Sequence, residues 1–443
     1  MIKKATTLFL LFLSLFSFAQ SNKEKVFNYT QQIISQLENH HYDSISQQFD
    51  STMLRQMNGE SLGEAWESLI NQFGDFDSFG KTNIDTTPGF YLSQTIVQYK
   101  KLKLLLSISF NDRFQIAGMF FYPKYNYTAP DYVNTLSFTE YKVAFGKTPY
   151  IVSGTLTVPN KTPNPPCALI VGGSGPTDRD GSVGENKTYK DIAWALACKG
   201  IAVLRFDKRT FAYGAQLLTE KYNGKQLTIK EEYLDDVKMA IDYLGKNKKV
   251  DAKKIVVIGH SEGGMLAPLI CEQNKKIAGI IIMAGNARPM QDLVIEQLDF
   301  LYKDIALPTN ERLKIDALKR HALNAKSANL KPNYPEDSLP GATASYWISI
   351  NQYHQTEVAK KIKHPILFLQ GERDYQVTMT DLSIWKQTLS NKKNCTFHSY
   401  PKLNHLFLEG EGKPNKEEYQ KKSNVPEYVS KDIVDWINNL PKK

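Results

Sequence analysis

A serine flanked by glycines carries the strongest chemical signal in the chain. The segment GHSEG at residues 259–263 follows an apolar run over residues 254–258 that is typical of a buried strand, and a helical pattern follows over residues 265–273. A serine on a sharp strand-to-helix turn presents its hydroxyl above the sheet, and the glycines let the neighbouring backbone pass without collision. This arrangement predicts that Ser261 is a nucleophile for acyl transfer.

A serine hydroxyl is a weak nucleophile, so it needs a base, and the base needs a carboxylate that orients it. Asp374 stands in the loop after a strand-like run over residues 365–370, and His405 stands in the loop after the next run, residues 395–400. The carboxyl ends of parallel strands share one edge of a sheet. We therefore expect both side chains to lie beside Ser261.

Other candidate acids and bases fit less well. Glu372 is the rival acid, but Asp374 lies further past the strand, where a side chain can turn towards the base. His260 neighbours the nucleophile and is expected to have a packing role. The remaining histidines lack the strand-end position of His405; they are His40, His41, His321, His354, His364 and His398.

The pattern of strands and helices indicates how these side chains are positioned. From about residue 133, after two runs that favour an antiparallel start, short continuous apolar runs alternate with helical ones. A parallel sheet buried between helices requires this pattern. The alternation stops over residues 286–363, where helical patterns predict a cap over the site. We expect an α/β domain over residues 133–443 with this helical cap inserted.

Five motifs in this order resemble the α/β-hydrolase esterases related to dienelactone hydrolases and prolyl-oligopeptidase-type enzymes. They are GGSGPTDRDG from residue 172, RFDKR from residue 205, GHSEGG from residue 259, GERD from residue 371 and NH at residues 404–405. The resemblance implies a triad of Ser261, Asp374 and His405, hydrolysis of short-chain carboxylic esters through an acyl-enzyme, and no cofactor. Thr210 departs from the pattern, because glycine usually follows RFDKR in these relatives.

The glycine-rich segment after the apolar run 168–171 is where such enzymes stabilise the oxyanion with backbone N–H groups. We expect the donors to be the N–H groups of Ser174 and Glu262, with Gly173 or Gly175 as near alternatives. The segment lacks both the Lys-Ser/Thr of a phosphate-binding loop and the spacing of a dinucleotide-binding motif, which argues against a nucleotide site.

Two charged triplets, residues 178–180 and 207–209, are expected to lie in loops at the same sheet edge. We expect these charges to pair and brace the loops, with substrate orientation as the alternative.

Residues 22–125 are expected to form a small α+β domain, with helices packed on one face of an antiparallel sheet. The segments at residues 65–66 and 72–74 resemble a cone-shaped ketosteroid-isomerase-like domain. The expected helices cover residues 23–38, 43–57 and 62–73, and the expected strands cover residues 90–99, 101–110 and 114–121.

The first residues predict export. Lys3 and Lys4 precede an apolar run over residues 8–18, and residues 17–19 end in small side chains at the positions that signal peptidase reads. A signal peptide over residues 1–19, cleaved after Ala19, predicts a periplasmic or secreted protein. The run is short for a membrane anchor, so no anchor is expected after cleavage.

Composition narrows the function classes. The chain has 443 residues, of which 42% are hydrophobic and 23% charged, as is usual for a folded soluble protein. Its net charge of +9 comes from scattered lysines and arginines without interleaved aromatics, so no nucleic-acid binding is expected. No metal-ligand spacing is present among the four cysteines, which could form disulfides or remain buried thiols; they are Cys167, Cys198, Cys271 and Cys395.

The expected partner is a small-molecule ester, and other functions stay open. A peptidase of the prolyl-oligopeptidase type would usually need a propeller domain or an amine-binding site, and the sequence reveals neither. A C–C bond hydrolase is also possible chemistry for this triad. A non-catalytic binding protein is disfavoured, because it has no need of all three triad residues. The natural substrate, the role of the first domain and the oligomeric state are not fixed by the sequence.

Overall fold

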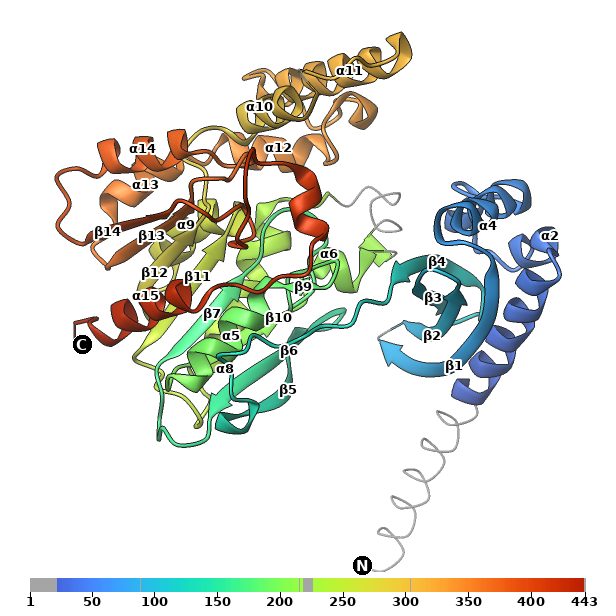
Figure 1. The fold of residues 1–443 in the computed structure, drawn as a ribbon, viewed down its shortest axis with the longest axis horizontal. Helices are drawn as coiled ribbons and strands as arrows, with labels where there is room; N and C mark the ends of the chain where they lie inside the picture. The colour runs from blue at the N-terminus through green and yellow to red at the C-terminus, as the bar shows by residue number, and fades with distance from the viewer. Residues whose placement is uncertain (1–21, 88, 215, 218–225, 303, 442–443) are drawn as a thin grey trace, which may run out of the picture. The chain divides into compact units, whose positions relative to one another are not determined.

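A computed structural model of the chain describes residues 22–87, 89–214, 216–217, 226–302 and 304–441. The predicted signal peptide over residues 1–19 lies outside these residues. The chain divides into two compact units, Met1–Asn126 and Tyr127–Lys443, and each is described by itself (Figure 1).

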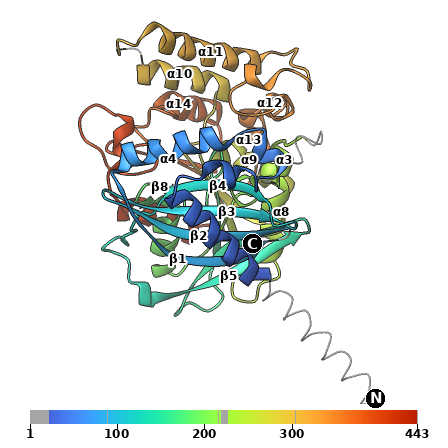
Figure 2. The same ribbon diagram turned by 90° about the vertical axis from the view of Figure 1, so that its right-hand side faces the viewer.

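The first unit is an antiparallel sheet in the order β1-β2-β3-β4 with helices packed against it, as predicted. Figure 2 shows the helix over residues 22–38 crossing the strands. The core of this unit consists of buried side chains from its helices and strands, among them Trp66, Val97 and Leu106. The remaining elements are α2 (Tyr42–Ser46), α3 (Ser51–Leu54), α4 (Gly59–Phe73), β1 (Phe76–Thr87), β2 (Phe90–Tyr99), β3 (Lys103–Asn111) and β4 (Ile116–Pro123).

Two sequence predictions for this unit were wrong. The single helix expected over residues 43–57 is broken into α2 and α3, because Asp50 caps a new helix by accepting hydrogen bonds from the N–H groups of Thr52 and Met53. The preceding segment instead pairs with Ile116 of β4. Strand β1 was not predicted at all, because its polar sequence lacks apolar alternation and it pairs on one side only, with β2.

The second unit is built on an eight-stranded sheet in the order β14-β13-β12-β11-β7-β10-β6-β5. Its strands are parallel from β14 to β10, and β6 and β5 are antiparallel, which confirms the antiparallel start and the buried parallel sheet. The strands are β5 (Phe138–Lys147), β6 (Tyr150–Pro159), β7 (Cys167–Val171), β10 (Ala202–Phe206), β11 (Ile255–His260), β12 (Ile277–Met283), β13 (Ile366–Gly371) and β14 (Cys395–Tyr400). A small hairpin, β8 (Ser182–Val183) and β9 (Asn186–Lys187), lies apart from the sheet.

Helices cover both faces of this sheet, so its central strands are buried throughout. Leu169 of β7 packs into the core with helices α8 (Asp235–Leu244), α9 (Glu262–Gln273) and α14 (Met379–Thr388). The next residue, Ile170, packs on the opposite face with α5 (Thr188–Cys198) and α15 (Glu427–Asn438). Alternate residues of these strands face opposite sides of the sheet, and both sets are apolar, because each side is covered by a layer of helices.

The predicted cap segment is helical. It contains α10 (Met290–Tyr302), α11 (Thr309–Lys326), α12 (Ala344–Asn351) and α13 (Gln355–Lys361). Figure 1 shows α10, α11 and α12 stacked beyond one edge of the large sheet. Two further elements precede α8 in the chain: α6 (Arg209–Ala212) and a π-helical turn, η2 (Lys230–Leu234), that leads into α8.

Candidate active site

Ser261 lies on the turn between β11 and α9, in a backbone conformation that L-residues rarely adopt, with φ 55° and ψ −120°. Its N–H donates to the carbonyl of Met283 at 2.9 Å, which anchors the turn to β12. The two glycines of the motif lie against each other: a Cβ on Gly259 would lie 2.2 Å from the carbonyl oxygen of Gly263. The glycines are therefore required by the close packing that holds Ser261, whose side chain is half-buried.

Asp374 and His405 are brought together in the loops after β13 and β14. Nδ1 of His405 lies 2.7 Å from Oδ2 of Asp374, and both residues are buried. The carboxylate also accepts hydrogen bonds from the side chain of Gln370 and from the N–H groups of Gln376 and Val377. These donors fix its orientation, so that Nδ1 of His405 carries the proton and Nε2 is left to act as a base.

Glu372, the rival acid, points elsewhere. Its side chain is exposed and accepts a hydrogen bond from Ser399 at 2.8 Å. The structure therefore brings Asp374, and not Glu372, to the histidine.

His260 connects the nucleophile turn to the histidine loop, a role that the sequence analysis did not predict. One ring nitrogen, Nε2, lies 2.8 Å from the carbonyl oxygen of His405, and Nδ1 lies 2.9 Å from the hydroxyl of Tyr189. A carbonyl can only accept, so Nε2 carries the proton and Tyr189 donates to Nδ1. Burial, with a smaller contribution from His405, lowers the pKa of His260 to about 3, so this ring is neutral in ordinary buffers.

The ring of His260, the residue before the nucleophile, has its centroid 4.8 Å from that of His405. Among the hydrogen bonds of the described residues, none joins Ser261 Oγ to a nitrogen of His405. In the free form of many hydrolases this contact is long and tightens only when substrate binds.

The glycine-rich loop after β7 lies directly against the nucleophile. A Cβ on Gly173 would lie 3.0 Å from Cβ of Ser261, so a larger residue would require the loop or the serine to shift. The N–H groups of Ser174 and Glu262 have no hydrogen-bond partner among the described residues. The N–H of Gly173, which was an expected alternative donor, is already bonded to the hydroxyl of Tyr189 at 3.2 Å. Ser174 and Glu262 keep their N–H groups available, and the assignment of the oxyanion donors stays a prediction.

Behind this loop lies a buried polar network that the sequence analysis did not predict. Lys208 forms an ion pair with Glu232 at 2.7 Å, and the hydroxyls of Tyr233 and Tyr346 lie 3.0 and 2.5 Å from the two oxygens of the Glu262 carboxyl. All five side chains are buried. Burial raises the pKa of Glu262 above its usual range and that of both tyrosines well above theirs. In the sequence, this network was indicated by the charged lysine in RFDKR and by the glutamate after the serine.

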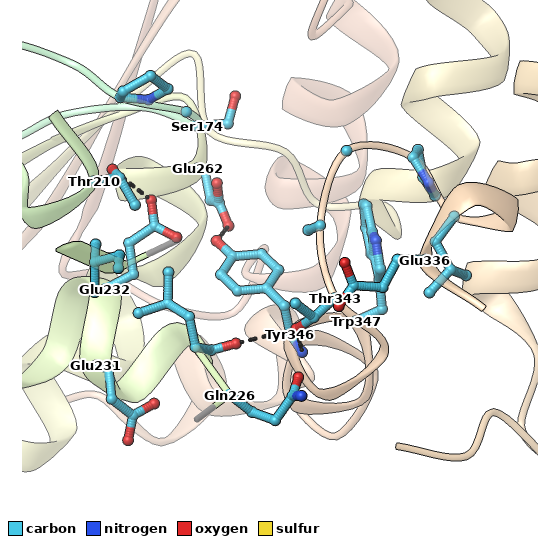
Figure 3. A pocket seen from close by; sticks show the side chains of 18 of the residues that line it. Ser174, Thr210, Gln226, Glu231, Glu232, Glu262, Glu336, Thr343, Tyr346 and Trp347 are labelled. Atoms are coloured by element: carbon cyan, nitrogen blue, oxygen red, sulfur yellow. Dashed lines mark hydrogen bonds between the residues drawn. The ribbon is translucent and has the colours of Figure 1, made fainter. Parts of the chain in front are cut away.

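A cavity of about 800 Å³ opens between this network and the cap. Figure 3 shows Ser174, Glu262 and Tyr346 around it, with the carboxyl of Glu262 and the hydroxyl of Tyr346 facing one another. Thr210, the residue that departs from the family pattern, lines it and donates to Glu232 at 3.2 Å. The apolar wall comes mainly from the cap; it includes Met290, Val294, Leu339, Pro340, Ala342 and Trp347. The cavity offers an apolar surface beside the nucleophile turn.

The charged triplets pair as expected. The guanidinium of Arg179 makes two hydrogen bonds to the carboxylate of Asp207, and Arg205 pairs with Asp180. Arg209 forms a buried ion pair with Asp236 of α8. These pairs brace the loops at the sheet edge; Lys208 pairs with Glu232 and also reaches the glycine-rich loop.

No group of three or more His, Cys, Asp or Glu residues within the described ranges is arranged to hold a metal ion. In the same part of the chain, no helix has the length and hydropathy needed to span a bilayer. All four cysteines are free thiols, and burial raises the pKa of Cys167 and Cys395.

Comparison with known proteins shows the family of the chain. Residues 180–412 match the model of the serine aminopeptidase S33 family, and residues 30–119 match a family of unknown function, DUF3887. Esterase EstD of Thermotoga maritima is 31% identical over 434 residues, which cover 97% of this chain and 99% of that protein.

Solved structures are similar at lower identity. Est1E from Butyrivibrio proteoclasticus is 16% identical, with coverage of 67% of this chain and 97% of that chain and a TM-score of 0.44. The Pyrococcus furiosus esterase Pf2001 is 14% identical, with coverage of 72% and 99% and a TM-score of 0.45. From the matched family model and the full-length relative, this chain belongs to the serine aminopeptidase S33 family of α/β hydrolases.

Proposed function

We propose that the chain hydrolyses short-chain carboxylic esters of small molecules through a covalent acyl-enzyme on Ser261. The observation that carries the proposal is the convergence at one sheet edge of a strained serine, a buried Asp374–His405 pair and a loop with unpaired N–H groups. The full-length similarity to a protein named as an esterase supports ester substrates.

Acylation begins when Oγ of Ser261 attacks the ester carbonyl carbon while Nε2 of His405 takes the hydroxyl proton. The carbonyl oxygen becomes an oxyanion that accepts hydrogen bonds from the N–H groups of Ser174 and Glu262. Asp374 stabilises the imidazolium through Nδ1–H. His405 then gives its proton to the leaving alcohol, the C–O bond breaks, and the acyl group remains on Ser261.

Deacylation repeats these steps with water. His405 takes a proton from a water molecule that attacks the acyl carbon, and the same two N–H groups hold the second oxyanion. Collapse returns the proton to Oγ of Ser261 and releases the carboxylic acid. No cofactor is required by this sequence of steps.

Hydrolysis of p-nitrophenyl esters of increasing acyl length tests the proposal and measures the size of the acyl site. Ser261→Ala should lower kcat by about 10⁴-fold or more. The matched control is Ser383→Ala, which removes an exposed hydroxyl on α14 that, among the described residues, bonds only to the carbonyl of Met379. Equal activity in wild type and Ser261→Ala, or no activity in wild type, would reject the esterase proposal.

Peptide hydrolysis is the second candidate, and the description of the matched family favours it. Aminoacyl p-nitroanilides carry the free amine and the amide bond that an aminopeptidase needs. Assayed beside the esters, they should be turned over at least 10²-fold more slowly if the ester proposal holds. Faster turnover of an anilide than of every ester would assign the site to peptides instead.

We also propose that the protein is exported, on the basis of the predicted signal peptide. Mass spectrometry of the protein recovered from the producing cells should find a chain that begins at Gln20. A chain that retains residues 1–19 would contradict the proposal.

A further inference from the structure

The carbonyl oxygen of Gly173 accepts two hydrogen bonds from buried side chains. Nζ of Lys208 lies 2.9 Å away and the hydroxyl of Tyr233 lies 2.7 Å away, and these two donors lie 2.7 Å from each other. Their side chains are 3% and 2% exposed, so water does not compete for the contacts. A buried carbonyl with two donors, one of them charged, is held more firmly than an ordinary loop carbonyl.

The carbonyl of Gly173 and the N–H of Ser174 belong to the same peptide unit. A trans peptide is planar, so its C=O and N–H point in opposite directions. Holding the oxygen of Gly173 against Lys208 and Tyr233 therefore turns the N–H of Ser174 away from them. Gly173 lies against Ser261, so this N–H is held on the nucleophile's side of the loop.

The preceding peptide unit is fixed as well, because the N–H of Gly173 donates to Tyr189, which bonds to His260. The loop is therefore held at both flanking peptide units. Tyr233 has one proton and two acceptors, the carbonyl of Gly173 and the carboxyl of Glu262. Burial favours the neutral form of Glu262, which can itself donate and leave the phenolic proton to Gly173.

We infer that Lys208 and Tyr233 are positioning residues of the oxyanion site, which set the direction and the donor strength of the Ser174 N–H. The inference rests on the proposed function. The ammonium polarises the peptide unit from its carbonyl end, which makes its N–H a stronger donor to the oxyanion. Both residues act through the peptide, because their polar groups are occupied by contacts within the protein.

The test compares Tyr233→Phe and Lys208→Met with wild type in steady-state hydrolysis of p-nitrophenyl acetate. Removal of a whole oxyanion donor lowers kcat by about 10²–10³-fold, which sets the upper limit for a positioning effect. We expect about a 10-fold loss of kcat in Tyr233→Phe and about 100-fold in Lys208→Met, with KM within about 3-fold of wild type.

The matched control is Tyr353→Phe. It deletes another buried tyrosine hydroxyl that donates to a backbone carbonyl, that of Met265 in α9, at 2.8 Å. It should leave kcat unchanged. Tyr233→Phe is the decisive variant, because Lys208→Met leaves Glu232 buried without its ion-pair partner and can fail to fold.

A second readout separates positioning from general damage. A trifluoromethyl ketone adds to the serine and places an oxyanion in the same site, so its inhibition constant should rise by the same factor as kcat falls. Binding of the product alcohol should not change. Unchanged kcat in folded Tyr233→Phe, a loss confined to KM, or an equal loss in Tyr353→Phe would overturn the inference. An inactive wild type would reject the proposed function itself, and the inference with it.

Discussion

The two sides of Ser261 are built in different ways. On the side of the base, Asp374 is held by Gln370, Gln376 and Val377, all within four residues of it along the chain. On the side of the oxyanion loop, Gly173 is held by Lys208 and Tyr233, which lie 35 and 60 residues away in sequence.

This difference decides what each side depends on. On the base side, Asp374 is held by residues of its own loop. Its position relative to His405 therefore depends mainly on the pairing of β13 with β14. The oxyanion side is assembled from separate segments and includes a buried charge pair. Loss of one partner from a buried ion pair strongly destabilises the protein. The oxyanion side is therefore the more sensitive of the two to substitution.

Asp374→Asn should give the largest effect among the variants that separate the two sides. Loss of the carboxylate favours the wrong tautomer of His405, and kcat should fall by about 10⁴-fold with little change in KM. Steady-state kinetics on a p-nitrophenyl ester measures this. Glu372→Gln, which changes the neighbouring exposed carboxylate, should stay within about 2-fold of wild type; a loss in Glu372→Gln as large as that in Asp374→Asn would refute the assignment of the acid.

Gly173→Ala tests the loop side. The added methyl would lie 3.0 Å from Cβ of Ser261, so the loop must move back and the Ser174 N–H with it. We expect kcat to fall by about 10²–10³-fold, the loss expected for one oxyanion donor. Gly245→Ala is the control, because its nearest neighbour is the flexible end of Lys276. Wild-type kcat in Gly173→Ala would show that the loop does not approach the serine.

Asp236→Ala tests the scaffold of the same side. It leaves the guanidinium of Arg209 buried and unpaired, which should lower the free energy of unfolding by about 3–5 kcal/mol. Asp242→Ala on the same helix breaks exposed pairs with Lys238 and Lys276 and should cost about 1 kcal/mol or less. Urea unfolding of both variants measures the difference, and equal losses would contradict a buried pair.

His260, which contacts both the nucleophile turn and the His405 loop, has an effect on stability that changes with pH. Its pKa is about 3 in the folded protein against an ordinary 6.5, so the unfolded chain takes up the proton first as the pH falls. The stability that neutral His260 provides is complete above pH 6.5 and is lost towards pH 3, at up to about 1.4 kcal/mol per pH unit. His260→Gln should lack this component in urea unfolding at successive pH values; identical pH profiles for variant and wild type would exclude a buried neutral ring.

The same contrast explains what could be predicted from the sequence. Strand β13 was predicted to within one residue at each end, because apolar runs mark buried strands, and β14 was predicted with its exact ends. The order of these two strands placed Asp374 and His405. Polar strand β1 had no such mark. The contacts of Lys208, Tyr233 and Tyr346 could not be predicted, because no local period relates residues that meet only through the fold.

Covalent trapping of the nucleophile tests the central claim most directly. The full-length protein is treated with a fluorophosphonate, digested, and the modified peptide is identified by mass spectrometry, with Ser261→Ala treated in parallel. The account predicts one phosphonyl group per chain, located on Ser261, with loss of esterase activity in proportion to labelling and no labelling of the variant. Labelling of a different residue, or full esterase activity in a protein whose Ser261 is modified, would contradict it.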